Sequence, residues 1–217
     1  ARTIGPLVIL GAVSLWGLEG TYKLIPFGIV ASIILYFAFR NVHVSEDIKK
    51  RGEWKGISST LRQHMVLFIA LGGFTFFRAI MKSAMVTFLP TFLNLQGESL
   101  WFSGISLSVL ELSGAAGTLF AGGISDKIGR RTSLFFIALT APVFMLLFLF
   151  SGKVFSFIFI ILIGLVMFGS TPIILALIQD HAKERPAFLN SIYMTISFFF
   201  SAVCVIIVGG LSDILGM

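Results

Sequence analysis

Seven stretches of mostly apolar residues dominate the sequence, and most of them have the length that a helix needs to cross a lipid bilayer. Crossing the hydrocarbon layer takes about 20 such residues. Lipid offers no partner for backbone N–H and C=O groups, so each stretch is predicted to be a helix. The chain is therefore expected to be an all-α integral membrane protein, a polytopic helical bundle. The stretches are 4–18 (a short one), 22–39, 64–90, 101–124, 132–151, 154–178 and 187–209.

Composition excludes several other classes of protein. Of the 217 residues, 57% are hydrophobic and 12% are charged, whereas soluble domains carry about 25% charged residues. Cys204 is the only cysteine, which excludes a disulfide within the chain and a cysteine-based metal site. The sequence contains neither a zinc-protease motif nor a serine-hydrolase motif. We therefore expect no metal, no cofactor and no enzymatic activity.

Lys and Arg are distributed unevenly between the connections on the two sides of the predicted spans. The connections 40–63, 126–131 and 180–186 hold eleven of them, whereas the opposite side holds two, Lys23 and Lys153. Cytoplasmic loops carry this excess in membrane proteins. The segment 40–63 is thus expected to be a cytoplasmic linker. The protein itself is expected to be a multi-pass protein of the bacterial or archaeal inner membrane. Topology also explains the formal charge of +6 without a nucleic-acid partner.

An eight-residue pattern occurs twice, each time at the end of an apolar span. Residues 122–129 (GGISDKIG) closely match residues 209–216 (GGLSDILG), and the two copies lie three spans apart. By the predicted topology they face opposite sides of the membrane. Equivalent segments in opposite orientation are typical of an inverted three-helix repeat, a frequent device in secondary transporters.

Residues 122–131 also resemble the cytoplasmic loop signature of the major facilitator superfamily, G-x-x-x-D-[RK]-x-G-R-[RK]. The resemblance implies a partial major facilitator fold with inverted three-helix repeats. On that register 1–39 would be helices five and six of the N-terminal half, 40–63 the cytoplasmic linker, and 64–217 helices seven to eleven of the C-terminal half. Helices one to four and helix twelve of the same protein would be missing. The matching residues are Gly122, Asp126, Lys127, Gly129, Arg130 and Arg131.

A narrower resemblance concerns the fosmidomycin-resistance type of efflux protein. It is carried by 76–83 (FFRAIMKS) together with 88–90 (FLP). Gly5-Pro6 is similar to the start of the family's antiporter motif, although Ile9 and Leu10 stand where that motif has glycines. The resemblance implies proton-coupled efflux of an anionic drug or metabolite, and hence drug resistance.

Three ionisable residues fall inside predicted spans: Arg78, Lys82 and Glu111. Each costs roughly 2.5–3.5 kcal/mol in a bilayer unless it is paired or hydrated, so each calls for a function. Arg78 and Lys82 are four residues apart and share a helix face. Glu111 lies at a similar depth on the next helix and could meet them. We interpret Glu111 as a protonatable group, and the two bases as attracting an anionic substrate or holding Glu111 ionised. The alternative is a buried ion pair that only fixes packing.

Further polar residues share faces with this group. Ser108 lies on the same face as Glu111. Asn190, Tyr193, Ser197 and Ser201 lie on one face of the last span. Ser108, Asn190 and Ser197 are therefore candidates for lining a cavity, although polar packing contacts would give the same pattern.

The loop signature suggests a conformational function. Ser113, Gly117, Ala121 and Ser125 recur every four residues, which leaves a smooth face for close helix contact. Asp126 is placed to meet the N–H groups at a helix end or an arginine. Arg130 and Arg131 are then available as charged latches to the neighbouring half. The alternative is that they only anchor the loop on the cytoplasmic side.

The function expected from these observations is secondary active transport of a small molecule, with the proton as coupling ion and the lipid bilayer as surroundings. An uptake carrier for an organic anion or a sugar-like metabolite is one alternative. A channel or a non-transporting membrane scaffold is another, but a channel would reuse one pore-lining motif around a ring, whereas these charges occur once.

Overall fold

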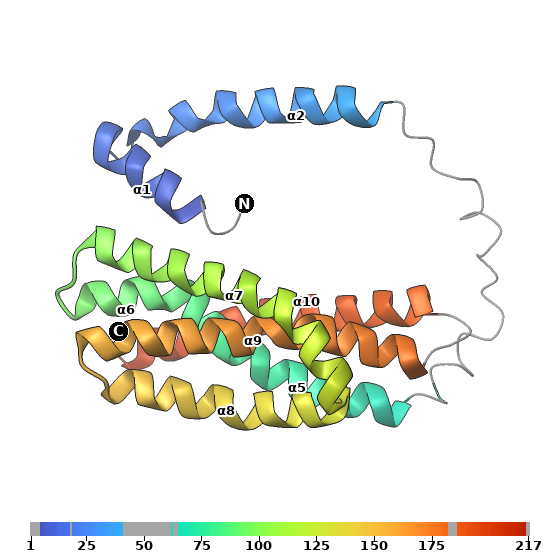
Figure 1. Ribbon diagram of the computed structural model, residues 1–217. Helices are drawn as coiled ribbons and strands as arrows, with labels where there is room; N and C mark the ends of the chain where they lie inside the picture. The colour runs from blue at the N-terminus through green and yellow to red at the C-terminus, as the bar shows by residue number, and fades with distance from the viewer. Residues whose placement is uncertain (1–4, 18, 41–61, 63–64, 182–185, 216–217) are drawn as a thin grey trace. The chain divides into compact units, whose positions relative to one another are not determined.

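The computed structural model describes residues 5–17, 19–40, 62, 65–181 and 186–215, and every regular element in this part of the chain is helical (Figure 1). Six helices are long and apolar enough to cross a membrane. The predicted all-α membrane fold class is therefore confirmed. The six long helices correspond to the six longer predicted stretches, and α1 corresponds to the short first one. Most of the predicted linker 40–63 lies outside the described residues, as do Lys183 and Arg185. The elements are α1 (Gly5–Trp16), the 3-10 helix η1 (Glu19–Leu24), α2 (Ile25–Phe39), α5 (Met65–Ser83), the π-helix η2 (Ala84–Phe88), α6 (Leu89–Leu95), α7 (Leu100–Ile128), α8 (Arg130–Phe150), α9 (Lys153–His181) and α10 (Pro186–Leu215).

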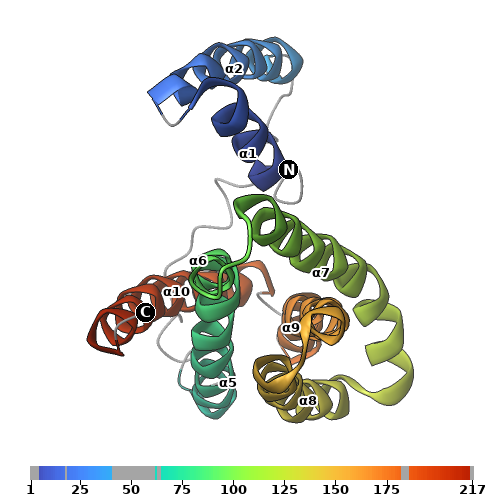
Figure 2. The same ribbon diagram turned by 90° about the vertical axis from the view of Figure 1, so that its left-hand side faces the viewer.

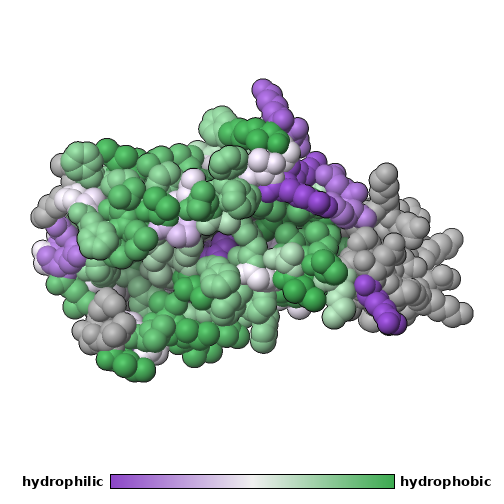
Figure 3. Space-filling view, turned by 90° about the horizontal axis from the view of Figure 1, so that it is seen from below, coloured by the Kyte–Doolittle hydropathy of each residue, from purple (hydrophilic) through white to green (hydrophobic). Residues whose placement is uncertain are grey.

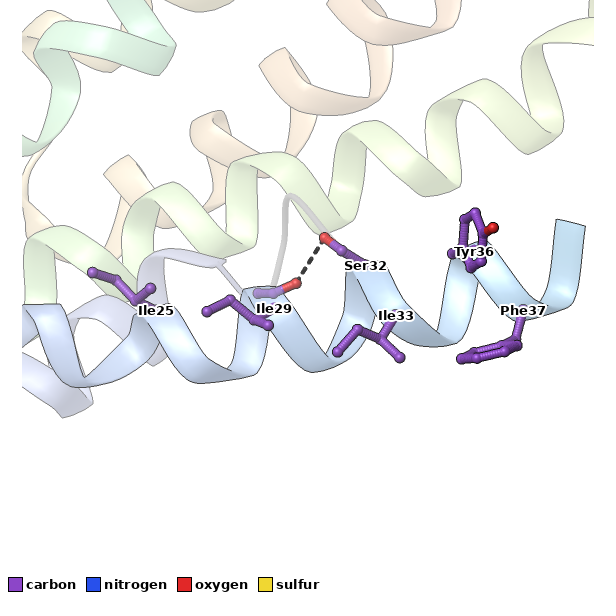
Figure 4. A pocket seen from close by; sticks show the side chains of 7 residues that line it. Ile25, Ile29, Ser32, Ile33, Tyr36 and Phe37 are labelled. Carbon is purple, nitrogen blue, oxygen red and sulfur yellow. Dashed lines mark hydrogen bonds between the residues drawn. The ribbon is translucent and has the colours of Figure 1, made fainter. Parts of the chain in front are cut away.

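The chain divides into two compact units, Val8–Leu67 and Ala1–Leu7 with Phe68–Met217. In the smaller unit, the Lys23 ammonium lies 5.4 Å from the centre of the Trp16 ring. No residue of α2 is buried. One side of α2 forms a shallow hollow in which Ser32 donates a hydrogen bond of 2.9 Å to the Gly28 carbonyl (Figure 4). This unit exposes apolar helix surface of the kind that lipid or further helices cover.

In the larger unit, α9 packs against both α7 and α8 (Figure 2). The contact with α7 is made by small residues: a side chain at Gly117 would collide with the Leu165 backbone, and one at Gly164 would collide with Ser113. Backbones that approach this closely gain dispersion contacts, which drive helix association in membranes. The predicted small-residue face of 113–125 is confirmed, and α9 is its partner.

The span that contains Arg78 extends further than predicted. The prediction ended it at Pro90, but helical backbone continues to Leu95. A π-helical turn over 84–88 interrupts the regular pattern, and Pro90 then stands near the start of α6. Proline is tolerated in the first turn of a helix because its missing N–H would have no intrahelical partner there. Gly97, with a φ of 84°, ends the span, and the side chain of Ser99 caps α7 by accepting from Phe102 N–H at 3.1 Å.

Candidate functional site

Arg78 is half-buried within the long α5–α6 span, where it contacts two other helices. Its Nη1 donates to Oγ1 of Thr171 on α9 at 3.1 Å, and its Nη2 donates to Oγ of Ser197 on α10 at 3.4 Å. Its Nε is buried and has no hydrogen-bond partner among the described residues. Within the same residues no carboxylate forms an ion pair with Arg78. The guanidinium is therefore held by neutral groups, which position the charge without cancelling it.

Lys82 lies one helical turn further along α5 and approaches the same helix, α9. Its Nζ is 6.0 Å from the centre of the Phe168 ring. Phe168 precedes Thr171 by three residues, so both side chains lie on one side of α9. Arg78 thus faces a hydroxyl on α9, and Lys82 faces an aromatic ring on the same helix. These contacts agree with the prediction that Arg78 and Lys82 share one face of their helix.

Glu111 is half-buried on α7. In the part of the chain that the structure describes, no hydrogen bond or ion pair joins it to Arg78, whose contacts go to Thr171 and Ser197 instead. The structure thus brings Arg78 together with Ser197, but it does not bring Arg78 and Glu111 into direct contact.

The other predicted polar residues lie inside the larger unit. Ser108 is buried, and its hydroxyl has no hydrogen-bond partner in the described part of the chain. The same is true of the Asn190 side-chain oxygen and of the Tyr193 hydroxyl, in a ring that is only 2% exposed. An unpaired buried polar group costs about 1–3 kcal/mol. Such groups are suited to meet water or a bound polar molecule.

Arg78 also borders a cavity of about 410 Å³ between α5, α8 and α9. Its lining is otherwise apolar and includes Phe77, Pro142 and Met167. The face seen in Figure 3 is largely hydrophobic, with a hydrophilic spot in a hollow near its middle. Arg78 therefore has polar contacts towards α9 and α10 and apolar surroundings towards α8.

The loop signature forms a compact turn between α7 and α8. Gly129 is the single residue between the two helices, and its φ of 97° and ψ of 136° lie in a region that residues with a side chain rarely adopt. Its N–H donates to the Ser125 carbonyl at 2.9 Å, which closes the end of α7. A side chain at this position would strain the backbone of the turn, which explains why the signature has glycine here.

Arg130, at the start of α8, connects two carboxylates. Its Nε lies 2.8 Å from Oδ2 of Asp180 at the end of α9, and its Nη2 lies 3.4 Å from Oδ1 of Asp126. Asp126 was predicted to meet either the N–H groups of a helix end or an arginine. The structure shows the arginine, Arg130. Both partners of Arg130 belong to the same unit as Arg130. The latch observed for Arg130 therefore joins α7, α8 and α9 to one another.

Arg131 makes a second contact between α8 and α9. Its Nη2 donates to Nε2 of His181 at 3.0 Å, and Nδ1 of His181 donates to the Leu177 carbonyl at 2.8 Å. A guanidinium only donates and a carbonyl only accepts, so the pair of contacts selects the neutral ring with its proton on Nδ1. His181 is exposed, as its predicted position at a span end implies. Lys127 is also exposed.

Sequence reasoning missed four residues of these sites: Phe168, Thr171, Asp180 and His181 as partners of the cations. Asp180 had a detectable signal, since it is an acidic residue at the edge of a basic connection. Phe168 is one of 24 phenylalanines, and nothing in the sequence distinguishes it. Among the described residues, no group of His, Cys, Asp and Glu could hold a metal ion.

Comparison with known proteins identifies the family. The family sequence model that describes the Major Facilitator Superfamily matches residues 1–216. Neither a curated protein nor a solved structure matches the chain. The family is one of transporters, and together with the membrane-spanning helices it supports a secondary transporter of small molecules in a lipid bilayer. This multi-pass membrane protein belongs to the Major Facilitator Superfamily.

Proposed function

We propose that the chain forms part of a secondary transporter that exports a small organic anion in exchange for protons. The observation that carries the proposal is the state of Arg78, whose guanidinium is half-buried in an apolar span and held by two hydroxyl groups. Hydroxyls fix its orientation but leave its charge uncompensated. Because a bare charge in a membrane is costly, an anionic substrate that enters the site gains a strong electrostatic attraction.

Lys82 supports an anion over a neutral substrate. It lies one turn from Arg78 and faces the same helix, with its ammonium near the ring of Phe168. A sugar-like metabolite would be recognised by hydroxyl and amide groups and would have no use for two cations. Organic phosphonates and carboxylates fit this pair, and phosphonates agree with the resemblance to fosmidomycin-resistance proteins.

Glu111 is proposed as the proton-carrying group. It is half-buried on an apolar helix, and the described residues give it no ionic partner. A carboxyl group in such a place can bind and release a proton as its surroundings change. The helix that carries it, α7, packs on α9, and α9 also contacts Arg78 and Lys82. Proton binding and substrate binding would then act on the same helix.

The contacts of Arg130 and Arg131 are proposed to hold one conformation of the carrier. They tie the start of α8 to the end of α9 on the side predicted to be cytoplasmic. Both are polar contacts that can break and re-form at moderate cost. Their rupture would accompany a change in packing between α7, α8 and α9. The division of the chain into residues 1–39 of one half, the linker 40–63 and residues 64–217 of the other half is proposed from its similarity to the family.

Resistance in living cells tests the direction of transport. The complete protein is expressed in an efflux-deficient bacterium, and growth is followed in increasing fosmidomycin with and without a protonophore. We expect resistance that the protonophore abolishes. Arg78→Gln should remove resistance, and Arg78→Lys should retain part of it. Lys23→Gln is the control, since it removes an exposed cation that belongs neither to the site nor to the loop signature.

The possible results separate the alternatives. Increased sensitivity to the drug would indicate uptake and contradict export. Resistance that survives the protonophore would contradict proton coupling. Resistance that survives Arg78→Gln, at equal protein levels, would contradict the proposed binding site.

A further inference from the structure

The cavity that Arg78 borders has a lining of nearly uniform character. It lies between α5, α8 and α9 (Figure 2) and has a volume of about 410 Å³. Among the described residues ten line it, of which nine are apolar and the tenth is Arg78. Ligand sites in proteins are commonly of this kind, with a mostly apolar wall and a small number of polar groups that orient the ligand. The cavity thus combines one cation with a large apolar surface.

The walls of the cavity differ in exposure, which shows where it opens. Met167 on α9 is 1% exposed and Ala141 on α8 is 5% exposed, so the floor is buried. Phe77 on α5 is 68% exposed, and Ala138 and Pro142 on α8 are exposed as well. These three residues form the rim. A molecule that enters from the surface of the larger unit can therefore place an apolar part against the buried floor.

We propose that this cavity binds the apolar body of the substrate while Arg78 binds its anionic head, so that the substrate is an amphipathic organic anion. The inference rests on the proposed function, since it takes Arg78 as the site of the anion. Arg78 donates to Thr171 and Ser197, and its Nε has no partner among the described residues. A guanidinium has five N–H donors. Donors therefore remain for a carboxylate or phosphonate head.

The volume of the cavity sets the size of the apolar body. An apolar cavity of roughly 150 Å³ takes a benzene molecule. At about 410 Å³ the cavity beside Arg78 has room for two fused rings or for one ring on a short chain. Each methylene group that moves from water to an apolar wall improves affinity about fourfold. A small hydrophilic anion would gain nothing from this surface, so the geometry favours an anion with an aromatic or aliphatic body.

Two phosphonates with the same head and different bodies test the inference. Saturable transport of methylphosphonate and of naphthylmethylphosphonate is measured in vesicles that contain the complete protein. We expect the KM of the naphthyl compound to be lower by about tenfold or more, because its rings fill the cavity. Equal KM values for the two compounds, or a lower KM for methylphosphonate, would overturn the inference.

A variant that narrows the cavity shows whether the body binds there. Ala138→Leu adds volume at the rim, at an exposed position where the larger side chain is compatible with folding. It should raise the KM of the naphthyl compound about fivefold or more and that of methylphosphonate by less than about twofold. Val143→Leu is the matched control, since Val143 is exposed on the same helix and lies outside the described lining. An Ala138→Leu protein that keeps the original KM for the naphthyl compound, or that loses affinity for both compounds equally, would overturn the inference.

Failure of this inference is distinguishable from failure of the proposed function. Arg78→Gln should raise the KM of both phosphonates, because they share the anionic head. If that variant transports methylphosphonate normally, or if neither phosphonate shows saturable transport, the proposed function is wrong. The cavity is then tested alone by thermal unfolding of the purified complete protein. Naphthylmethylphosphonate should raise the Tm of the original protein by about 2 °C or more and leave that of Ala138→Leu unchanged. A Tm of the original protein that does not respond to the compound would overturn the inference by itself.

Discussion

Nε of Arg130 lies 2.8 Å from Oδ2 of Asp180, and this ion pair connects the start of α8 to the end of α9. The two residues are far apart in sequence, and the α7–α8 turn brings Arg130 to Asp180. Asp126 adds a longer contact of 3.4 Å from within the same turn. The loop signature therefore has two structural features, a glycine that permits the turn and an arginine that fastens it.

The Arg130–Asp180 pair should contribute modestly to stability. The side chains are 24% and 51% exposed, so solvent screens their attraction, and we expect about 0.5–1 kcal/mol from the pair. Arg130→Gln and Asp180→Asn should each lower the thermal unfolding temperature in detergent, and the double variant should lower it little further. Thermal melting of the four proteins measures the coupling.

Lys127→Gln provides the control for that cycle, since it removes a charge from the same turn without touching Asp180. If it lowers the unfolding temperature as much as Arg130→Gln does, the effect reflects general surface charge. Strict additivity of the Arg130 and Asp180 variants would likewise show that the pair does not stabilise the turn.

Gly117 should be intolerant of any side chain. A methyl group there would collide with the backbone of Leu165, which cannot rotate away as a side chain can. We expect Gly117→Val to destabilise the larger unit by about 1–3 kcal/mol or to prevent its folding. Gly123→Val is the control, because that position on the same helix has open space around it. Equal unfolding temperatures for the two variants would contradict the close α7–α9 contact.

Gly129 should be sensitive for a different reason. Its φ of 97° is accessible to glycine, and alanine there would be strained by about 1–2 kcal/mol. Gly122→Ala, in open space on α7, should be neutral or slightly stabilising. The comparison is made by thermal unfolding of both variants. A Gly129→Ala protein as stable as Gly122→Ala would show that the turn has another conformation.

Cys204 reports on the contact between α5 and α10. It is fully buried, and its Sγ donates a weak hydrogen bond of 3.8 Å to the Phe76 carbonyl. We expect N-ethylmaleimide to modify it at least tenfold more slowly than the thiol introduced by Asp213→Cys near the exposed end of α10. Mass spectrometry of the labelled protein measures both rates. Comparable rates in the folded protein would contradict the packing of α10 on α5.

The helices and the α7–α9 contact were predictable from sequence because their signals are local. Apolar length identified the spans, and Ser113, Gly117 and Ala121 identified a face for close packing before its partner was known. The end of the Arg78 span was predicted too early because Pro90 usually stops a helix. The π-turn at 84–88, which has no sequence signature, moves Pro90 into the first turn of α6 instead.

The candidate site was predictable only in part. Arg78 and Lys82 stand out because charges are rare in membrane spans. Thr171 and Phe168, which contact them, do not stand out, because they are ordinary residues of an apolar helix. The rotation of that helix relative to α5 determines which side chains they contact. Depth along the spans indicated that Glu111 could meet Arg78, and it did not indicate the hydroxyls of Thr171 and Ser197, to which Arg78 donates its hydrogen bonds. Pairing between helices depends on three-dimensional packing, which residue spacing along one helix does not determine.

Flux of a radiolabelled organic phosphonate through the purified complete protein in vesicles tests the central claim most directly. An imposed pH gradient should drive saturable flux, which collapses when the gradient is dissipated. Arg78→Gln should lower kcat/KM at least tenfold, while Lys23→Gln, which removes an exposed cation outside the site and the loop signature, should leave it unchanged. Flux that rises linearly with concentration, or flux that Arg78→Gln leaves intact, would contradict an anion carrier with Arg78 at its binding site.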